Sequence, residues 1–177
     1  AKGAKVILEA PKPLFRLLKS LNGVAELIES GTTIPQFDYH CSLMDFPLLF
    51  GTTLETIPSA IPYLSADAIR IKNWSQKLDR KQKPRIGLIW SGGFRPNQPE
   101  VWGVNERRNM PVDKLSYLKE IDADFYSLQK GETGVQALYP PEGLNLVNHT
   151  AYLHDFSDTA ALITHLDLVI SVDTSVV

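Results

Sequence analysis

The sequence predicts an α/β protein with two lobes, each built from strands that alternate with helices. Short apolar runs, rich in β-branched residues, alternate with segments whose leucines recur at helical spacing. The run Leu166 to Val172 is almost continuously apolar, which is typical of a strand covered on both faces. The charged segment Ile71 to Pro84 separates the two series. The chain is therefore expected to form a doubly wound lobe on either side of that segment, both lobes being incomplete.

The first lobe is expected to begin with a strand at Val6 to Ala10, a β-branched run that is closed by prolines. The following LFRLLKSL places its leucines on one face of a helix that stops at Asn22-Gly23. Two further strands are predicted at Val24 to Ile28 and at Phe37 to Leu43. A short helix over Phe46 to Phe50 then precedes proline-containing chain that leads to the linker.

The segment Ile71 to Pro84 has the composition of an inter-lobe helix or linker, because it is polar, densely charged and ends in proline. We therefore place the domain boundary near residue 80, with an N-terminal lobe and linker at 1–80 and a C-terminal lobe at 81–177. The chain begins without methionine and stops directly after an apolar run. We expect it to be a piece of a longer protein.

The second lobe is expected to contain several short strands and one long loop. Its strands are predicted at Arg85 to Trp90, Asp124 to Leu128, Asn145 to Val147 and Leu166 to Val172. The polar loop Ser91 to Asn109 is long for a compact protein, and loops of that length are usually functional or disordered. Helices are predicted after Pro111 and after Ser157-Asp158-Thr159, whose side chains are N-cap candidates.

Composition excludes several classes of protein. With 44% hydrophobic and 21% charged residues, the chain has the balance of a soluble globular protein. A formal charge of −2 provides no basic field for nucleic acid or an anionic membrane, and no apolar run suits a membrane span or a signal peptide. Cys41 is the single cysteine, which fits a reducing compartment, so we expect a cytoplasmic location.

Polar residues follow three predicted strands of the second lobe. These strand exits are Ser91-Gly92-Gly93, Gln129-Lys130-Gly131 and Asp173-Thr174-Ser175. In a parallel sheet they meet at one edge, where glycine lets a backbone approach a phosphate, lysine supplies charge and hydroxyl groups complete an anion cradle. We therefore expect Gly92, Lys130 and Thr174 to lie within reach of one diphosphate.

Each of these residues also has a structural interpretation. The glycine pair after Ser91 is compatible with the start of a flexible loop, and Lys130 with a solvated loop cation. Asp173-Thr174-Ser175 has the composition of a helix N-cap. The ERRN of Glu106 to Asn109 is either a surface charge cluster or a segment in which Arg108 reaches over the edge as a phosphate clamp.

The remaining chemistry-bearing residues do not form a recognisable site. His40 and Cys41 are adjacent in a predicted strand, so their side chains point to opposite faces and cannot chelate one metal. His149 and His154 lack metal-ligand spacing to a cysteine, and His165 is expected on a helix face. The sequence contains no nucleophile elbow, no P-loop and no dinucleotide-binding glycine fingerprint. We therefore predict no metal site.

Four segments of the second half resemble a known family. RIGLIWSGG, ERRNMPVDKL, FYSLQKGE and DFSDTAALITHLDLVISVDTSVV are similar to the carboxy-terminal domain of bacterial tetratricopeptide-repeat (TPR) proteins. Those domains look like heptosyltransferase-type glycosyltransferases and, more distantly, like O-linked N-acetylglucosamine transferases. The first half resembles the same proteins through VILEAPKPLFRLLKSLNGV and FDYHCSLMDFPLLFGTTLETIP. The resemblance implies two Rossmann-like lobes of the type-B glycosyltransferase architecture, truncated at both ends.

The resemblance also implies roles for individual residues. It assigns nucleotide-sugar binding to Ser91, Gly92, Gln129, Lys130, Asp173, Thr174 and Ser175. Lys130 and Arg108 would be the catalytic cations, which stabilise the departing diphosphate without an obligatory metal or other cofactor. Asp158 and Thr159 match the family's Asp-Thr-Ala and are interpreted as helix capping.

The chain departs from the family at several places. Glu132 replaces a common proline, the loop from Phe94 to Asn105 differs, and the family normally continues beyond both ends of this sequence. We expect a fragment, itself inactive, of an enzyme that moves a sugar from a nucleotide donor to a protein or glycan acceptor. The TPR helices of the parent chain are a further expected partner. The alternatives are an inactive interaction or scaffold module and, less favoured, an epimerase or other Rossmann enzyme.

Overall fold

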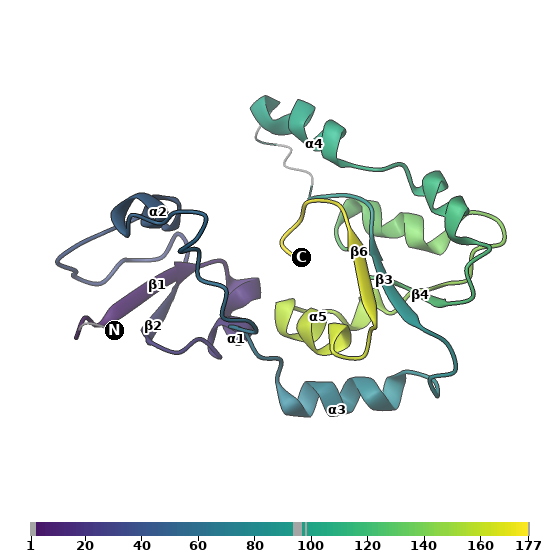
Figure 1. Cartoon of the computed structure of the whole chain (residues 1–177), viewed down its shortest axis with the longest axis horizontal. Coiled ribbons are helices and arrows are strands. Elements are labelled where there is room, and N and C mark those ends of the chain that lie inside the picture. Colours follow the sequence, from purple (N-terminus) through teal and green to yellow (C-terminus); the bar gives the residue numbers. More distant parts are fainter. Residues whose placement is uncertain (1–2, 94–96, 98, 177) are drawn as a thin grey trace. The chain divides into compact units, whose positions relative to one another are not determined.

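The chain folds into two compact units (Figure 1). The computed structural model describes residues 3–93, 97 and 99–176. The units are Ala1–Ser65 and Ala66–Val177, so the division falls before the boundary that we placed near residue 80. The physical reason is helix α3 (Ala68–Lys77), which packs on α5 (Phe156–Ile163) and adds Trp74 to the core of the second unit.

The first unit is built on two parallel strands, as the sequence predicted for its first two runs. Strand β1 (Val6–Ala10) pairs with β2 (Val24–Glu29), and the chain crosses between them through η1 (Lys12–Leu14) and α1 (Phe15–Leu18). The 3-10 helix η2 (Leu43–Asp45) and helix α2 (Phe46–Leu49) follow. The helix predicted at Phe46 to Phe50 is thus confirmed.

The strand predicted at Phe37 to Leu43 is wrong. Among the described residues, the sheet of this unit contains β1 and β2 alone, so segment 37–43 has no neighbour with which to pair its backbone. Phe37 and Tyr39 are exposed. The segment instead leads into η2, where the Ser42 hydroxyl accepts a hydrogen bond from the Met44 N–H at 3.2 Å.

The second unit contains a four-stranded parallel sheet, which confirms the α/β class. Its strands are β3 (Arg85–Ile89), β4 (Asp124–Ser127), β5 (Leu146–Val147) and β6 (Leu168–Ser171), arranged in the order β5-β4-β3-β6. All three pairings are parallel. Gly87 lies in the central strand, where a Cβ would come within 2.7 Å of the Leu128 and Leu166 side chains. Glycine is therefore the residue that lets these two leucines close over the strand.

Alternate residues of the sheet serve two hydrophobic clusters. Ile86, Leu88 and Trp90 pack in one cluster, together with residues of η4 (Val112–Leu118) and η5 (Glu132–Leu138). Ile89 belongs to the other cluster, which contains residues of α3 and α5. This alternation is the period of two expected when both faces of a strand are covered.

The last strand differs from its prediction. We expected Leu166 to Val172 to be covered on both faces, but β6 lies at the edge of the sheet, and its Leu168 and Ile170 are 50% and 42% exposed. Among the described residues, full coverage belongs to the central strand β3, all of whose residues are buried.

Three helical segments also differ from the predictions. The segment after Pro111 is the 3-10 helix η4, and the long loop contains η3 (Pro99–Val101) and α4 (Trp102–Arg108). Helix α5 begins after Asp155, whose carboxylate accepts hydrogen bonds from the N–H groups of the first turn. The predicted caps, Ser157 to Thr159, instead lie buried in that first turn. The described residues contain no helix with the length and apolarity that crossing a bilayer demands.

Candidate functional site

The candidate site lies where the sheet of the second unit changes its direction of growth. From β3 the chain proceeds to β4 and then β5 on one side, and it returns to place β6 on the other side of β3. Ligands of open parallel sheets bind beyond the carboxyl ends of the strands at such a switch point. Because the strands are parallel, the exits after β3, β4 and β6 lie at the same edge of the sheet.

Gln129, at the exit of β4, is buried and bonded in several directions. Its Oε1 accepts hydrogen bonds from the N–H groups of Trp90 and Ser91 at 3.1 and 2.9 Å. Its Nε2 donates to the Ser91 carbonyl at 2.9 Å and to the Thr133 hydroxyl at 2.8 Å. Gln129, which we predicted to contact the nucleotide, is thus a buried side chain that links the exits of β3 and β4.

Gly92, at the exit of β3, is held by the far end of the long loop. Its N–H donates to the Asn109 Oδ1 at 2.8 Å, and the Met110 N–H donates to the Trp90 carbonyl at 2.8 Å. Together with the Gln129 contacts, these bonds provide side-chain amide acceptors for three consecutive N–H groups, from Trp90 to Gly92. The backbone that we expected to cradle an anion is therefore already satisfied within the chain.

Arg108 bridges the exits of β3 and β6. Arg108 is the last residue of α4. Its guanidinium lies directly over Gly92, because a Cβ placed on that glycine would come within 2.6 Å of the Arg108 Cζ. Its Nη1 donates to the Asp173 carbonyl at 3.3 Å. Its Nε is buried and meets no acceptor within the part of the chain that the structure describes.

Lys130 lies on the other side of β3 from this bridge. Its side chain is exposed, and its Nζ donates to the Thr150 carbonyl at 3.1 Å, in the 3-10 helix η6 (Thr150–Tyr152) that follows β5. Because a carbonyl is a neutral acceptor, this contact leaves the charge of the ammonium group uncompensated. The Asn148 side chain holds Thr150 in turn, by accepting from its N–H and its hydroxyl.

The third exit contains Asp173, Thr174 and Ser175. The Thr174 hydroxyl lies 3.1 Å from the Ser171 hydroxyl at the end of β6, and it accepts from the Val176 N–H at 3.5 Å. Asp173 and Ser175 are exposed. The structure thus joins Gly92, Arg108 and Asp173 by direct contacts, whereas Lys130 turns towards η6 and Thr174 towards β6.

Other charged groups of the second unit stabilise the fold. Arg70 of α3 pairs with Asp158 of α5, whose other oxygen accepts from the His154 N–H at 3.0 Å, so Asp158 has a structural role. Lys81 donates to Asp167 at 2.5 Å, and this hydrogen bond, followed by one from the Arg85 N–H, holds the pKa of Asp167 below its ordinary value.

The histidines do not form a ligand set. His165 bonds through its Nε2 to the Ile71 carbonyl at 2.8 Å, and His149 packs against the rings of Trp74, Tyr126 and Tyr152. Within the described ranges, no group of histidine, cysteine, aspartate and glutamate side chains is arranged to hold a metal ion. In the loop from Phe94 to Asn105, which departs from the family pattern, residues 94–96 and 98 lie outside the described residues.

Comparison with known proteins gives no relative from which roles could be transferred. No family model matches the chain, and no curated protein or solved structure is significantly similar to it. Function is therefore inferred from the geometry of these side chains. One of them, Asn109, entered the sequence interpretation merely as part of a charged segment, because its contact with Gly92 spans 17 positions and follows no local motif.

Proposed function

We propose that the second unit binds the diphosphate of a nucleotide sugar at the sheet edge between β3 and β6. The observation that carries this proposal is Arg108, whose guanidinium lies across the switch point with a buried Nε that lacks an acceptor among the described residues. A planar guanidinium presents several donors in a geometry that matches phosphate oxygens. An anion at this edge would accept hydrogen bonds from the terminal nitrogens of the guanidinium, one of which donates to the exposed Asp173 carbonyl.

In the longer protein to which the chain is proposed to belong, the proposed reaction is transfer of the sugar from this donor to a protein or glycan acceptor. Negative charge grows on the diphosphate as the glycosidic bond breaks, and a nearby cation stabilises that charge. Arg108 and Lys130 are the proposed cations, on opposite sides of β3. Because the N–H groups from Trp90 to Gly92 are already bonded, these side chains replace the backbone cradle in the mechanism. The mechanism requires no metal.

The two-lobe, Rossmann-like architecture belongs to the same proposal. The order β5-β4-β3-β6 corresponds to the first four strands of a dinucleotide-binding sheet counted from the central strand. The first unit, with its parallel pair β1 and β2, would be the acceptor-side lobe. A cytoplasmic location is proposed on the basis of the single cysteine.

Calorimetric titration of the 177-residue chain with a panel of nucleoside diphosphates tests the proposal. We expect at least one of them to bind, and Arg108→Ala to weaken that binding by about ten-fold or more, the usual effect of losing a charged hydrogen bond. Lys130→Ala should weaken it to a smaller extent. Arg80→Ala is the matched control, since Arg80 is an exposed arginine of the same unit. The absence of binding by every nucleoside diphosphate would contradict the proposal.

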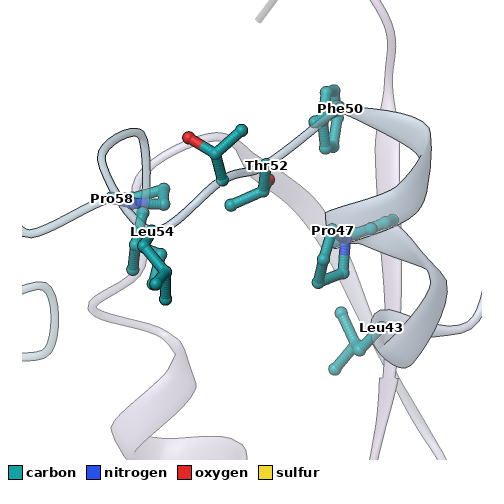
Figure 2. A pocket seen from close by; sticks show the side chains of 9 residues that line it. Leu43, Pro47, Phe50, Thr52, Leu54 and Pro58 are labelled. Carbon is teal, nitrogen blue, oxygen red and sulfur yellow. The ribbon is translucent and has the colours of Figure 1, made fainter.

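A second candidate function is that of an interaction module, and the first unit favours it. The hollow in Figure 2 has a volume of about 790 Å³ and is mainly apolar. Leu43, Pro47 and Phe50 line one side, and Leu54 and Pro58 face them from the following loop. Exposed apolar surface of this kind is typical of protein-binding sites, and TPR helices of the parent are the proposed partner. A scaffold of this class should bind no nucleoside diphosphate specifically.

A further inference from the structure

Three consecutive residues at the end of the long loop engage the exit of β3. The Arg108 guanidinium covers Gly92, the Asn109 side chain accepts from the Gly92 N–H, and the Met110 N–H donates to the Trp90 carbonyl. Two of these three contacts converge on a single glycine. The loop is thus fixed most closely at the point where the guanidinium rests.

We infer that Asn109 is a positioning residue for the anion site, an inference that rests on the proposed function. Asn109 acts by holding Gly92 against the backbone that carries Arg108, so that the guanidinium stays over the glycine. A long arginine side chain loses less conformational freedom on binding an anion when it is already held in place. Removal of the Asn109 amide should therefore weaken anion binding without removing any atom from the proposed anion contact.

The chemistry of the amide explains why asparagine suits this position. Its Oδ1 is a neutral acceptor that satisfies the Gly92 N–H at 2.8 Å. An aspartate would offer the same acceptor, but its carboxylate would add negative charge beside the neighbouring arginine and beside the site of the anion. The inference thus separates two properties: the acceptor atom keeps the loop in place, and its lack of charge leaves Arg108 available.

The test uses the 177-residue chain labelled with ¹⁵N and titrated with inorganic pyrophosphate. The amide resonance of Gly92 reports its hydrogen bond, and the shift of resonances with concentration gives the pyrophosphate affinity. In Asn109→Ala, we expect the Gly92 resonance to move upfield, its hydrogen exchange to accelerate and the affinity to fall by about ten-fold. Asn145→Ala is the matched control, because Asn145 is an exposed asparagine just before β5.

Asn109→Asp tests the second property, the lack of charge, because it keeps the acceptor for the Gly92 N–H. We expect it to keep the protected Gly92 amide while pyrophosphate affinity still falls by about ten-fold, because the added charge opposes the anion. If Asn109→Ala fails to fold, Asn109→Asp still tests the proposal, because wild-type affinity with a protected Gly92 amide would contradict the claim that the lack of charge leaves Arg108 available. If the wild-type chain binds pyrophosphate and either variant binds it with the same affinity, the role of Asn109 is overturned and the proposed function still stands. If the wild-type chain binds neither pyrophosphate nor any nucleoside diphosphate, the proposed diphosphate site is itself refuted, and the role of Asn109 with it.

Discussion

Replacing Gln129 by alanine is expected to destabilise the second unit by about 2–6 kcal/mol. The side chain is 3% exposed, and its Oε1 is the acceptor for the N–H groups of Trp90 and Ser91. These two residues are 0% and 5% exposed, so water does not readily replace the lost acceptor. Each orphaned buried N–H costs about 1–3 kcal/mol, and two such groups give the stated range. That loss is a large part of the roughly 5–15 kcal/mol by which domains are stable.

Urea denaturation followed by tryptophan fluorescence measures this effect. All three tryptophans, Trp74, Trp90 and Trp102, belong to the second unit, so the signal follows that unit alone. The matched control is Gln82→Ala, an exposed glutamine of the same unit, for which we expect a change within about 0.5 kcal/mol. A loss below about 1 kcal/mol for the Gln129 variant would refute the reasoning, since it would show that the two N–H groups find another acceptor.

Three further predictions follow from the same unit. Gly92→Ala should displace the guanidinium that covers this glycine and weaken nucleoside diphosphate binding several-fold, as measured by calorimetry. Gly93→Ala is the control: its Cβ would meet nothing within 4 Å, so this variant should bind as tightly as the wild-type chain. Arg70→Ala should cost about 3 kcal/mol in urea denaturation by leaving a buried carboxylate unpaired, and adding Asp158→Asn should recover part of that loss. The folded state holds the pKa of Asp167 below its ordinary value of 3.8, so the ionised carboxylate stabilises the fold at pH values above 3.8. This stabilisation disappears as the pH falls through the folded-state pKa. Asp167→Asn should therefore flatten the fall in stability below about pH 4, and an unchanged acid profile would argue against it.

The strands could be predicted where apolar runs have partners that bury them. Arg85 to Trp90 is such a run, and it became the central strand because β4 and β6 supply neighbours on both sides. Phe37 to Leu43 has similar apolar content but no strand beside it among the described residues, and it stays irregular. Local composition indicates which segments suit a strand, whereas hydrogen-bonding neighbours decide which of them become one.

Helix starts were harder to predict, because several residues compete for each cap. The sequence around α5 offers Asp155, Ser157, Asp158 and Thr159 as candidates. Asp155 caps the helix because its extended backbone lets the carboxylate reach the N–H groups of Ser157 and Asp158. Asp158 is instead committed to the ion pair with Arg70, a contact between residues 88 positions apart that no local pattern indicates.

The candidate site could be placed from the sequence, but its internal arrangement could not. Polar residues after strands correctly marked the sheet edge, since parallel strands share their carboxyl ends. The direction of each side chain depends on partners elsewhere in the chain. Gln129 turns inward because Trp90 and Ser91 offer unsatisfied N–H groups, and Lys130 turns to the Thr150 carbonyl.

The strand order has a consequence for how the polypeptide is made. A ribosome synthesises β3, β4 and β5 before β6, yet β6 pairs directly with β3. Until residues 168–171 emerge, the central strand carries an open flank of unpaired peptide groups, the kind of edge that invites aberrant pairing between nascent chains. The hydrogen bond from Arg108 to the Asp173 carbonyl forms later still, because residue 173 follows β6 in the chain.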